Sequence, residues 1–583
     1  MFAKKHCPIK TLILWAPPSK YVTIFSIIFI FAFSFINCGQ KDSSQSEQKA
    51  VVKQSGPETV SAKDRNTLIR DLDSDPQYLN PILTNDVPSS RVERLLFDSL
   101  LDIDGSPDSN LVGRLAESWE ISADKLAITF HLRSNVSWHD GEPFTAADVQ
   151  FTFETAMRDD IPAIGMKSTI EPVERVHASD DRTVIFFLKY PFSPSLQRLG
   201  RVFIVPQHRL DERGLALETE RRQLSKPVTF LTSQFNREPI GTGPYLFQEW
   251  KTAQYIKLTK NVHYYDQKHQ PKISELLIKI IPNRTAAFNI LQKNSLDVLR
   301  ARSMQYLRFQ RLPSLQQDFI AKKFFEPAYY YVGYNLSSEK PFFNDKMVRQ
   351  AMTHAVDRQA FIDKALYGLG HICTGPFYFR SWALNPNIEP LPYDLVKASK
   401  LLEAAGWHDS DGNGILDKKG VQFEFELLLP LGAPGLTQLA HIVQANVKKL
   451  AIEATIRTLE WSVYLEKKRS KDFDAFVGGW GLDVDPDVYS IWHSSQINNG
   501  NNYIGYRNNE VDQLLEQGRR EFERQKRQKI YWRIQEIMHD EQPCTFVYTR
   551  METYIISKRI ANFEISPFGL FDFFPGQLSW TLE

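Results

Sequence analysis

Apolar and polar residues repeat along the chain with two different periods, which predict strands and helices in irregular succession. Residues 126–133 and 183–189 alternate between apolar and polar positions, the pattern of half-buried strands. Thr145 and Asp148 form a capping-box pattern at the start of a helix. Further helices are predicted over 90–101, 345–356, 357–368, 394–405 and 509–540. Because no regular strand–helix rhythm emerges across 583 residues, we expect a mixed α/β protein with more than one lobe.

The first forty residues read as a targeting segment. Four lysines precede an uncharged and mostly apolar run at 21–36, and Cys38 stands where that run ends. The run is typical of a secretory signal and is shorter than the ~20 residues of a membrane-spanning helix. The cysteine resembles that of a bacterial lipoprotein signal, although Phe35 and Asn37 depart from the usual residues around it. We expect Cys38 to be lipidated and the body of the chain to be extracytoplasmic, with an uncleaved membrane anchor as the alternative.

The segment that follows the signal has the composition of a flexible tether. Residues 39–63 are rich in Gln, Ser and Lys and contain no aromatic residue, which predicts disorder. Two further cysteines, Cys373 and Cys544, remain in the body of the chain. They could form a disulfide in an oxidising compartment, but nothing in the sequence places them close together, so their pairing stays open.

Charge and motif content exclude several classes of protein. The 70 Lys and Arg residues are balanced by 69 Asp and Glu residues, which argues against nucleic acid as a partner. Signature motifs of zinc peptidases, serine hydrolases, dithiol redox proteins and P-loop nucleotide-binding proteins are missing, so we expect no enzyme, metal or cofactor. Residues 409–417 imitate the start of a calcium loop, but Gly420 stands where a bidentate Glu is needed, which favours a structural turn.

A series of short motifs resembles one protein family along nearly the whole mature chain. The motifs include LAESW, GTGPY, LLEAAGW and GWGLD, and each stands in the family's order. They occupy residues 115–119, 130–133, 138–149, 241–245, 348–358, 367–376, 401–407, 479–483 and 502–506. On these residues the chain resembles the family 5 extracytoplasmic solute-binding proteins of ABC importers, whose members include oligopeptide- and dipeptide-binding lipoproteins.

The resemblance implies a two-lobed α/β clamp like that of periplasmic binding proteins (type II, cluster C), with an extra inserted domain. Closure of the lobes around a ligand would be a hinge motion. The implied borders place the signal at 1–38, the tether at 39–63, lobe I at 64–107, 225–327 and 548–583, the inserted domain II at 108–224, and lobe III at 328–547.

Asp483 is the residue that the resemblance most directly assigns to a ligand. In the peptide-binding members, an aspartate at this position pairs with the α-ammonium group of the peptide. A desolvated ammonium group needs such a carboxylate partner and further hydrogen bonds. Asp485 is the alternative partner if the register of the loop differs. A purely structural alternative is that Asp483, Asp485 and Asp487 are turn and cap residues around Pro486.

The residues before Asp483 are expected to lie beside an extended peptide. By analogy with the family, the main chain at Trp480 and Gly481 would pair with the peptide as an added strand, which would allow broad specificity. Trp480 could wall a side-chain pocket or pack against its own lobe.

Two further segments are candidates at the cleft. Gly241, Thr242 and Gly243 are predicted to form a hinge or a turn at the cleft edge, where glycine permits a positive φ or a close backbone approach. Tyr334 and Asn335 lie where the chain would cross into lobe III, as ligand contacts or as the end of a strand. No Arg, Lys or His could be assigned to the carboxylate end of a peptide.

The resemblance therefore implies a monomeric substrate-binding component of an ABC transporter. It would capture peptides and deliver them to the importer's permease subunits while a lipid anchor holds it at a bacterial membrane. Binding of a non-peptide solute, such as a nickel chelate or a sugar, is one alternative. A surface lipoprotein used for adhesion or peptide sensing is another, and a peptidase would need a nucleophile or metal set that the sequence lacks.

Overall fold

The computed structural model describes residues 66–583, and its largest element is a sheet of twelve strands. The strands are β1 (Thr67–Leu72), β8 (Tyr245–Lys251), β9 (Tyr255–Lys260), β10 (Glu275–Ile280), β11 (Val298–Ala301), β12 (Phe319–Phe325), β13 (Ala328–Tyr334), β14 (Gly370–Ile372), β17 (Glu424–Pro430), β18 (Glu453–Leu459), β19 (Ala475–Gly481) and β20 (Cys544–Ser557). Their order is β18-β17-β19-β13-β20-β11-β1-β10-β9-β8, with β12 and β14 also paired to β20.

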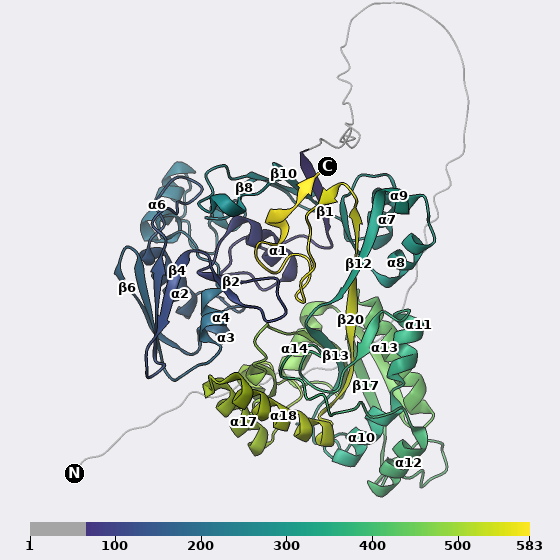
Figure 1. Ribbon diagram of the computed structural model, residues 1–583. Helices are drawn as coiled ribbons and strands as arrows, with labels where there is room; N and C mark the ends of the chain where they lie inside the picture. The colour runs from purple at the N-terminus through teal and green to yellow at the C-terminus, as the bar shows by residue number, and fades with distance from the viewer. Residues whose placement is uncertain (1–65) are drawn as a thin grey trace, which may run out of the picture. The chain divides into compact units, whose positions relative to one another are not determined.

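The long strand β20 belongs to both ends of this sheet. Its first part pairs with β13 and β14, and its last seven residues pair with β12, with β11 alongside. Figure 1 shows β20 running from the strands around β13 and β17 to those around β1 and β12. The chain makes a second crossing at residues 326–327, between β12 and β13. We call the part built on β1 and β8–β12 the first lobe, and the part built on β13, β14 and β17–β19 the second lobe.

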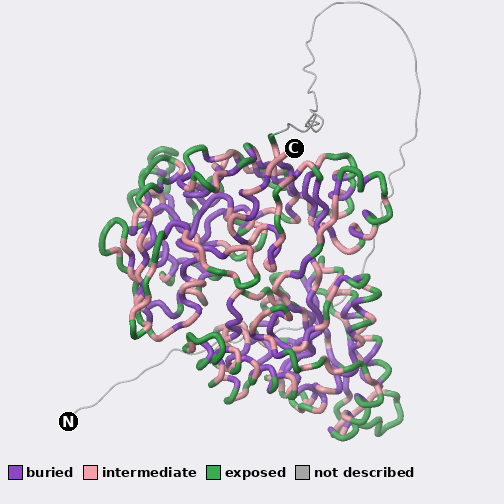
Figure 2. Tube along the Cα trace, viewed as in Figure 1, coloured by how far each residue is buried: buried purple, intermediate pink, exposed green. Residues whose placement is uncertain are grey.

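Helices cover the strands of both lobes. In the first lobe they are α1 (Val87–Leu96), α7 (Arg284–Gln292), α8 (Ser303–Gln310) and α9 (Leu315–Asp318). In the second lobe they are α10 (Lys346–Ala355), α11 (Arg358–Ala365), α12 (Leu395–Ala404), α13 (Pro434–Lys448), α14 (Trp461–Arg469), α15 (Tyr489–Trp492), α16 (Gln496–Asn499), α17 (Asn509–Arg520) and α18 (Arg524–Glu541). The buried residues follow the strands, and exposure concentrates in loops and on outer helix faces (Figure 2).

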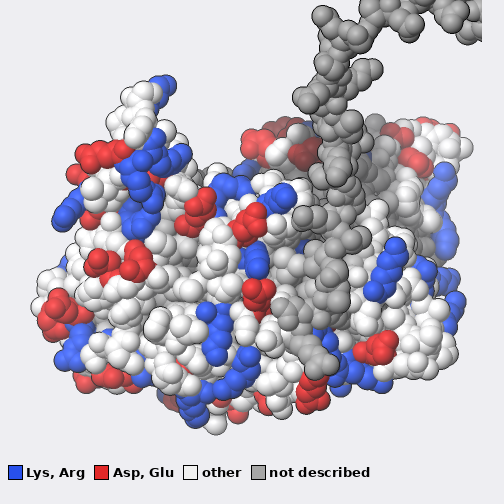
Figure 3. Space-filling view, turned by 90° about the horizontal axis from the view of Figure 1, so that it is seen from above, with Lys and Arg blue, Asp and Glu red and all other residues white. Residues whose placement is uncertain are grey.

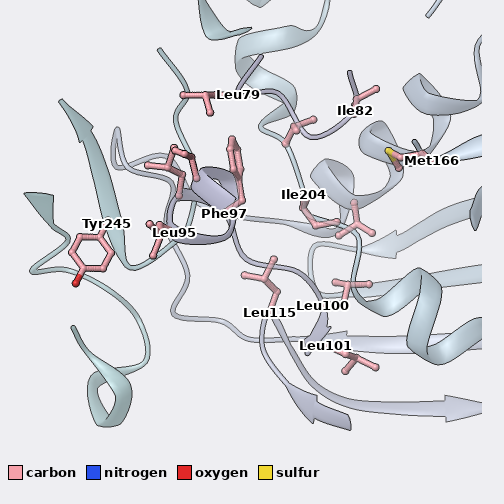
Figure 4. Packing of buried hydrophobic residues seen from close by; sticks show 14 of the residues in the cluster. Leu79, Ile82, Leu95, Phe97, Leu100, Leu101, Leu115, Met166, Ile204 and Tyr245 are labelled. Atoms are coloured by element: carbon pink, nitrogen blue, oxygen red, sulfur yellow. The ribbon is translucent and has the colours of Figure 1, made fainter. Parts of the chain in front are cut away.

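We call the segment between β2 (Leu101–Ile103) and β8 the inserted part. Its elements are β3 (Leu111–Gly113), β4 (Ala116–Ile121), β5 (Ala127–Leu132), β6 (Val173–Asp180), β7 (Thr183–Leu188), α2 (Ala146–Met157), α3 (Lys167–Ile170), α4 (Ser195–Gly200), α5 (Gln207–Leu210) and α6 (Glu212–Arg221). It contains a smaller antiparallel sheet of four strands, in the order β4-β5-β7-β6. The inserted part shares one continuous hydrophobic core with the first lobe. Figure 4 shows this junction, where Phe97 and Leu100 lie near Leu115 and Ile204.

Short elements complete the chain. They are η1 (Gln234–Asn236), η2 (Gln267–His269), η3 (Gly576–Ser579), β15 (Asp417–Lys418), β16 (Val421–Gln422), β21 (Ile560–Ala561) and β22 (Thr581–Leu582).

Most predicted elements are present with the predicted starting residues. The alternating segments form β5 and β7, and Thr145 with Asp148 forms the capping box of α2. Asp345, Asp357 and Asp394 are the N-caps of α10, α11 and α12. One prediction was wrong in length. The helix expected over 90–101 ends at Leu96, because the next residues lead into β2. The helical region expected over 509–540 is present as two helices, separated at 521–523.

Several sequence expectations meet the structure only in part. The signal, Cys38 and the tether lie outside the described residues. Cys373 and Cys544 are both buried and are free thiols rather than a disulfide. Within residues 66–583, no helix combines the length and apolarity needed to cross a membrane. Positive and negative side chains are interspersed on the face shown in Figure 3, in keeping with the near-zero net charge.

Candidate ligand-binding cavity

A cavity of about 220 Å³ brings together the inserted part, the second lobe and the C-terminal segment. Its lining includes Pro107 and Ser109, residues between 376 and 382, the loop 482–488, Arg524, Pro567 and Phe568. Pro327, at the crossing between β12 and β13, also lines it. Concave sites that gather polar groups from separate segments are where small ligands bind. The cavity therefore contains Asp483 and Asp485, two of the residues predicted to bind a ligand.

The loop that leaves β19 carries Asp483, Asp485 and Asp487, and we call it the acidic loop. Helices α17 and α18 pack beside it and supply two arginines. Both carboxylate oxygens of Asp485 accept hydrogen bonds from Arg527, at 2.5 and 2.6 Å. Asp487 accepts a hydrogen bond from Arg519 at 3.0 Å. Bidentate and charge-assisted contacts of this kind hold a buried carboxylate in one orientation.

Electrostatics keep Asp487 ionised although it is buried. Burial alone would raise its pKa, but Arg198 and Arg519 outweigh that effect and lower it below the usual value for aspartate. Arg198 comes from α4 of the inserted part, and its Nη1 lies 3.5 Å from Asp487 Oδ2. The same carboxylates raise the pKa of Arg198 despite its burial. The acidic loop is therefore bound to cations of both the second lobe and the inserted part.

Asp483 differs from its two neighbours in being accessible. Its side chain is 54% exposed, and it accepts no hydrogen bond from any described residue. Its one ion pair within residues 66–583 is with Arg198 Nε, at 3.8 Å. The end of β19 positions this carboxylate, and no described residue donates a hydrogen bond to its oxygens. Asp485, by contrast, has both oxygens occupied by Arg527.

Trp480 and Gly481 end β19 immediately before the acidic loop. The Trp480 ring stacks on Tyr503 with centroids 5.6 Å apart, and its Nε1 donates to the hydroxyl of Tyr331 at 3.1 Å. The indole thus packs against its own lobe, and neither Trp480 nor Gly481 is among the residues that line the cavity. One edge of β19 pairs fully with β13, whereas β17 pairs with it only at Ala475 and Phe476. The far edge of residues 478–481 has no strand partner in the described chain.

Tyr334 and Asn335 lie inside the second lobe. The Tyr334 ring is fully buried, and its hydroxyl pairs with that of Thr545 at 2.7 Å. The side-chain amide of Asn335 donates to the carbonyl oxygens of Lys471 and Phe473. These contacts fix the end of β13 and the loop before β19, and the structure does not bring the two side chains to the cavity lining.

The Gly241–Gly243 turn packs against the end of α1. A Cβ atom at Gly241 would lie 1.8 Å from the carbonyl oxygen of Leu96, so the backbone approach excludes any side chain there. The Thr242 hydroxyl accepts a hydrogen bond from the backbone N–H of Asp98 at 3.3 Å. The close approach proposed for these glycines is present, at the junction of the first lobe and the inserted part rather than in the cavity lining.

A buried lysine lies behind Trp480. Lys468 of α14 is 5% exposed, and four aromatic rings have their centroids 4.4–5.9 Å from its Nζ. Its ammonium group forms no ion pair or hydrogen bond with another described residue. Burial, with smaller contributions from Arg469 and Lys471, lowers the pKa of Lys468 to about 7. Cation–π attraction offsets part of this cost but leaves the ammonium without a counter-ion.

Residues 409–417 form a turn held by its own side chains. Asp409 accepts from the backbone N–H of Gly414, and Asp417 accepts from Ser410. In the described part of the chain, no group of three or more His, Cys, Asp or Glu side chains is arranged to hold a metal ion.

The cavity contains residues that sequence reasoning missed. Arg198 pairs with the acidic loop, and Arg380 and Trp382 line the cavity. The Arg380 guanidinium lies over the rings of Phe325 and Phe379 and forms no ion pair with a described residue. Each of these residues is about a hundred residues or more from Asp483 in the chain, and no local motif marks them.

Comparison with known proteins identifies relatives over most of the chain. The family model "Bacterial extracellular solute-binding proteins, family 5 Middle" matches residues 110–502. The oligopeptide-binding protein AppA of Bacillus subtilis is 31% identical over 552 residues, which cover 93% of this chain and 95% of the relative.

Solved structures show the same architecture. AppA of Bacillus subtilis in complex with a nonapeptide is 30% identical, with a TM-score of 0.75, and covers 89% of this chain and 99% of its own. NikZ of Campylobacter jejuni in complex with Ni(L-His) is 26% identical, with a TM-score of 0.75, and covers 89% of this chain and all of its own. The two-lobed α/β fold predicted from the sequence is confirmed by these matches.

Proposed function

Because this chain belongs to the bacterial extracellular solute-binding proteins of family 5, we propose that it captures peptides and delivers them to a membrane importer. The ligand would occupy the cavity between the inserted part, the second lobe and the C-terminal segment. The role is one of binding and transfer rather than catalysis. Peptide-binding relatives such as AppA favour peptides, whereas the nickel-chelate complex of NikZ represents the alternative ligand class.

One observation carries the proposal. Asp483 is the carboxylate of the acidic loop that lines the cavity, is half exposed and accepts no hydrogen bond within the described chain. An α-ammonium group would supply the charge and the N–H donors that this carboxylate lacks. Asp485 is the weaker candidate, because Arg527 occupies both of its oxygens.

The free edge of β19 supports the pairing of a peptide backbone. Residues 478–481 have no strand partner opposite β13, so their N–H and C=O groups on that edge are available. A peptide that extends out of the cavity along this edge would have one end near Asp483, two residues beyond the end of the strand. Backbone pairing does not depend on the side chains of the peptide, so it suits a protein that binds peptides of varied sequence.

Arg380 is the best placed partner for an anionic group of the ligand. It lines the cavity, and its aromatic contacts leave its N–H donors free of any carboxylate in residues 66–583. The lining therefore presents an accessible carboxylate and an accessible guanidinium, which suits a zwitterionic ligand.

The remaining parts of the proposal concern the cell surface. We propose that Cys38 is the lipidated residue, that residues 39–63 tether a monomeric body, and that the borders of lobe I, domain II and lobe III follow those given from the sequence. Delivery would require the permease subunits of an ABC importer. These features rest on the sequence and on the family.

The proposal is tested by releasing the ligands that the protein carries. The body of the chain is purified gently, weighed by native mass spectrometry and then denatured. We expect a heterogeneous set of short peptides from the wild type and at least about a tenfold loss of them from Asp483→Asn, because the neutral amide removes the charge–charge attraction.

A matched control separates this effect from a general change of charge. Asp472→Asn removes a carboxylate of the same lobe that is 72% exposed and paired with Lys467, away from the cavity lining. Its peptide content should equal that of the wild type. A single non-peptide mass, or no stabilisation by any peptide mixture, would contradict the peptide assignment.

A further inference from the structure

Asp483 is the member of the acidic loop for which its own lobe supplies no cation. Asp485 pairs with Arg527 and Asp487 with Arg519, so these two carboxylates are neutralised within the second lobe. Among residues 66–583, the single cation within ion-pair distance of Asp483 is Arg198, which belongs to the inserted part. The negative charge of Asp483, the candidate ligand anchor, is therefore balanced by an arginine of another part of the molecule.

The contact between Arg198 and Asp483 is an ion pair but not a hydrogen bond. The Nε···Oδ2 distance is 3.8 Å, beyond the range of about 2.7–3.2 Å for N–H···O bonds. Arg198 Nε is buried and has no hydrogen-bond partner in the described chain. The Arg198 side chain is 9% exposed against 54% for Asp483, and Asp483 rather than Arg198 lines the cavity. Arg198 thus acts on Asp483 from the side away from the ligand.

Arg198 has a second carboxylate that holds it in place. Its Nη1 lies 3.5 Å from Asp487 Oδ2, and its Nη2 donates to the backbone oxygen of Asp487 at 3.4 Å. Ser193 of the inserted part donates its backbone N–H to the oxygen of Arg519 at 2.7 Å, which adds a neutral contact beside the ion pairs. Arg198 therefore keeps a counter-ion when Asp483 turns to a ligand.

We propose that Arg198 is a specificity-determining residue that acts through Asp483 as its resident counter-ion. Its positive charge weakens the attraction of Asp483 for every incoming cation. A primary ammonium group overcomes this opposition because it brings three N–H donors and makes charge-assisted bonds of about 2.7–2.9 Å. An alkylated ammonium group carries the same charge with fewer donors and is rejected. The inference rests on the proposed function.

The test compares three forms of one peptide mixture. A protein whose lysines are acetylated is digested with pepsin, so that each peptide has its amine only at the N-terminus. One third stays free, one third is N-acetylated and one third is N-dimethylated, each with its own isotope label. The purified protein is mixed with all three, and the retained peptides are counted by mass spectrometry.

Arg198→Gln should raise one ratio and leave the other unchanged. The preference for free over acetylated peptides should rise about tenfold, since Asp483 no longer shares its charge with a resident cation. The preference for free over dimethylated peptides should keep its wild-type value, because the two amines carry the same charge and differ only in their N–H donors. Arg198→Lys, which keeps a cation, should restore most of the wild-type pattern.

A general defect cannot produce this signature. Arg158→Gln removes an arginine of the same inserted part that pairs with Asp160 at the surface, and it should leave both ratios unchanged. If Arg198→Gln lowers total retention with both ratios unchanged, Arg198 is only structural and the inference is wrong. If the wild type retains no peptide in any form, the proposed function fails, and the inference fails with it.

Discussion

The acidic loop and the surroundings of Lys468 compensate their charged side chains in opposite ways. The loop gathers three carboxylates and meets them with Arg198, Arg519 and Arg527. Lys468 lies among aromatic rings without a carboxylate in the described chain. In the first region the pKa of Asp487 is held below its usual value, and in the second the pKa of Lys468 falls to about 7.

Burial by itself therefore does not decide whether a side chain keeps its charge. A buried ion costs several kcal/mol unless a partner and hydrogen bonds compensate it, and otherwise the group gives up its charge by a shift of pKa. Asp487 stays ionised, and Arg527 holds both oxygens of Asp485 by hydrogen bonds, so the loop that carries Asp483 is fixed at two neighbouring residues. The buried ammonium group of Lys468 instead lowers the stability of the fold.

The largest effect is expected from removing a partner in the compensated region. Arg527→Met leaves the buried Asp485 without its two hydrogen bonds and should lower the free energy of unfolding by about 3–5 kcal/mol. Urea unfolding followed by tryptophan fluorescence measures this change. The double variant Asp485→Asn with Arg527→Met should recover most of the loss, and an additive result would contradict the comparison.

The opposite sign is expected in the uncompensated region. The lowered pKa of Lys468 corresponds to a cost of about 4 kcal/mol at pH 7, and the cation–π contacts offset about 2 kcal/mol of it. Lys468→Met removes both and should raise the free energy of unfolding by about 2 kcal/mol at pH 7. The folded pKa of about 7 lies below the ordinary 10.5, so the unfolded chain binds more protons between these values. The contribution of Lys468 to wild-type stability should therefore rise with pH across that window.

The gain from Lys468→Met should be full below about pH 7 and should shrink as the pH approaches 10.5. Lys467→Met serves as a control, because that lysine has an exposed partner in Asp472 and lies one residue away on α14. Urea midpoints at several pH values distinguish the two variants. A gain that does not vary with pH would mean that packing rather than charge causes it.

The smallest effect on stability is expected at Asp483. Its carboxylate is 54% exposed, and its ion pair with Arg198 is 3.8 Å long, so Asp483→Asn should change the free energy of unfolding by no more than about 0.5 kcal/mol. The same variant should lose the ligand, as described above. A large loss of stability would place Asp483 with Asp485 and Asp487 as a structural residue of the loop.

Many helices and strands could be predicted from the sequence, because their signals lie within a few residues of the chain. The N-caps at Asp345, Asp357 and Asp394 depend on a side chain and the backbone a few residues away, and so they could be predicted without tertiary contacts. The alternating strands β5 and β7 follow from period-two patterning for the same reason. The break at 521–523, which divides the helical region into α17 and α18, was not predicted.

The sequence by itself determined the family, the two-lobed α/β class and the candidate anchor Asp483, since ordered motifs and local periodicity carry that information. Tertiary structure alone decided which aspartate of the acidic loop accepts no hydrogen bond within the described residues. Arg198 precedes Asp487 by 289 residues, and Arg519 and Arg527 follow their partners by 32 and 42 residues. These ion pairs therefore depend on how the helices pack against the acidic loop. Electrostatic partners are set by distance in space rather than along the chain, and no motif records them.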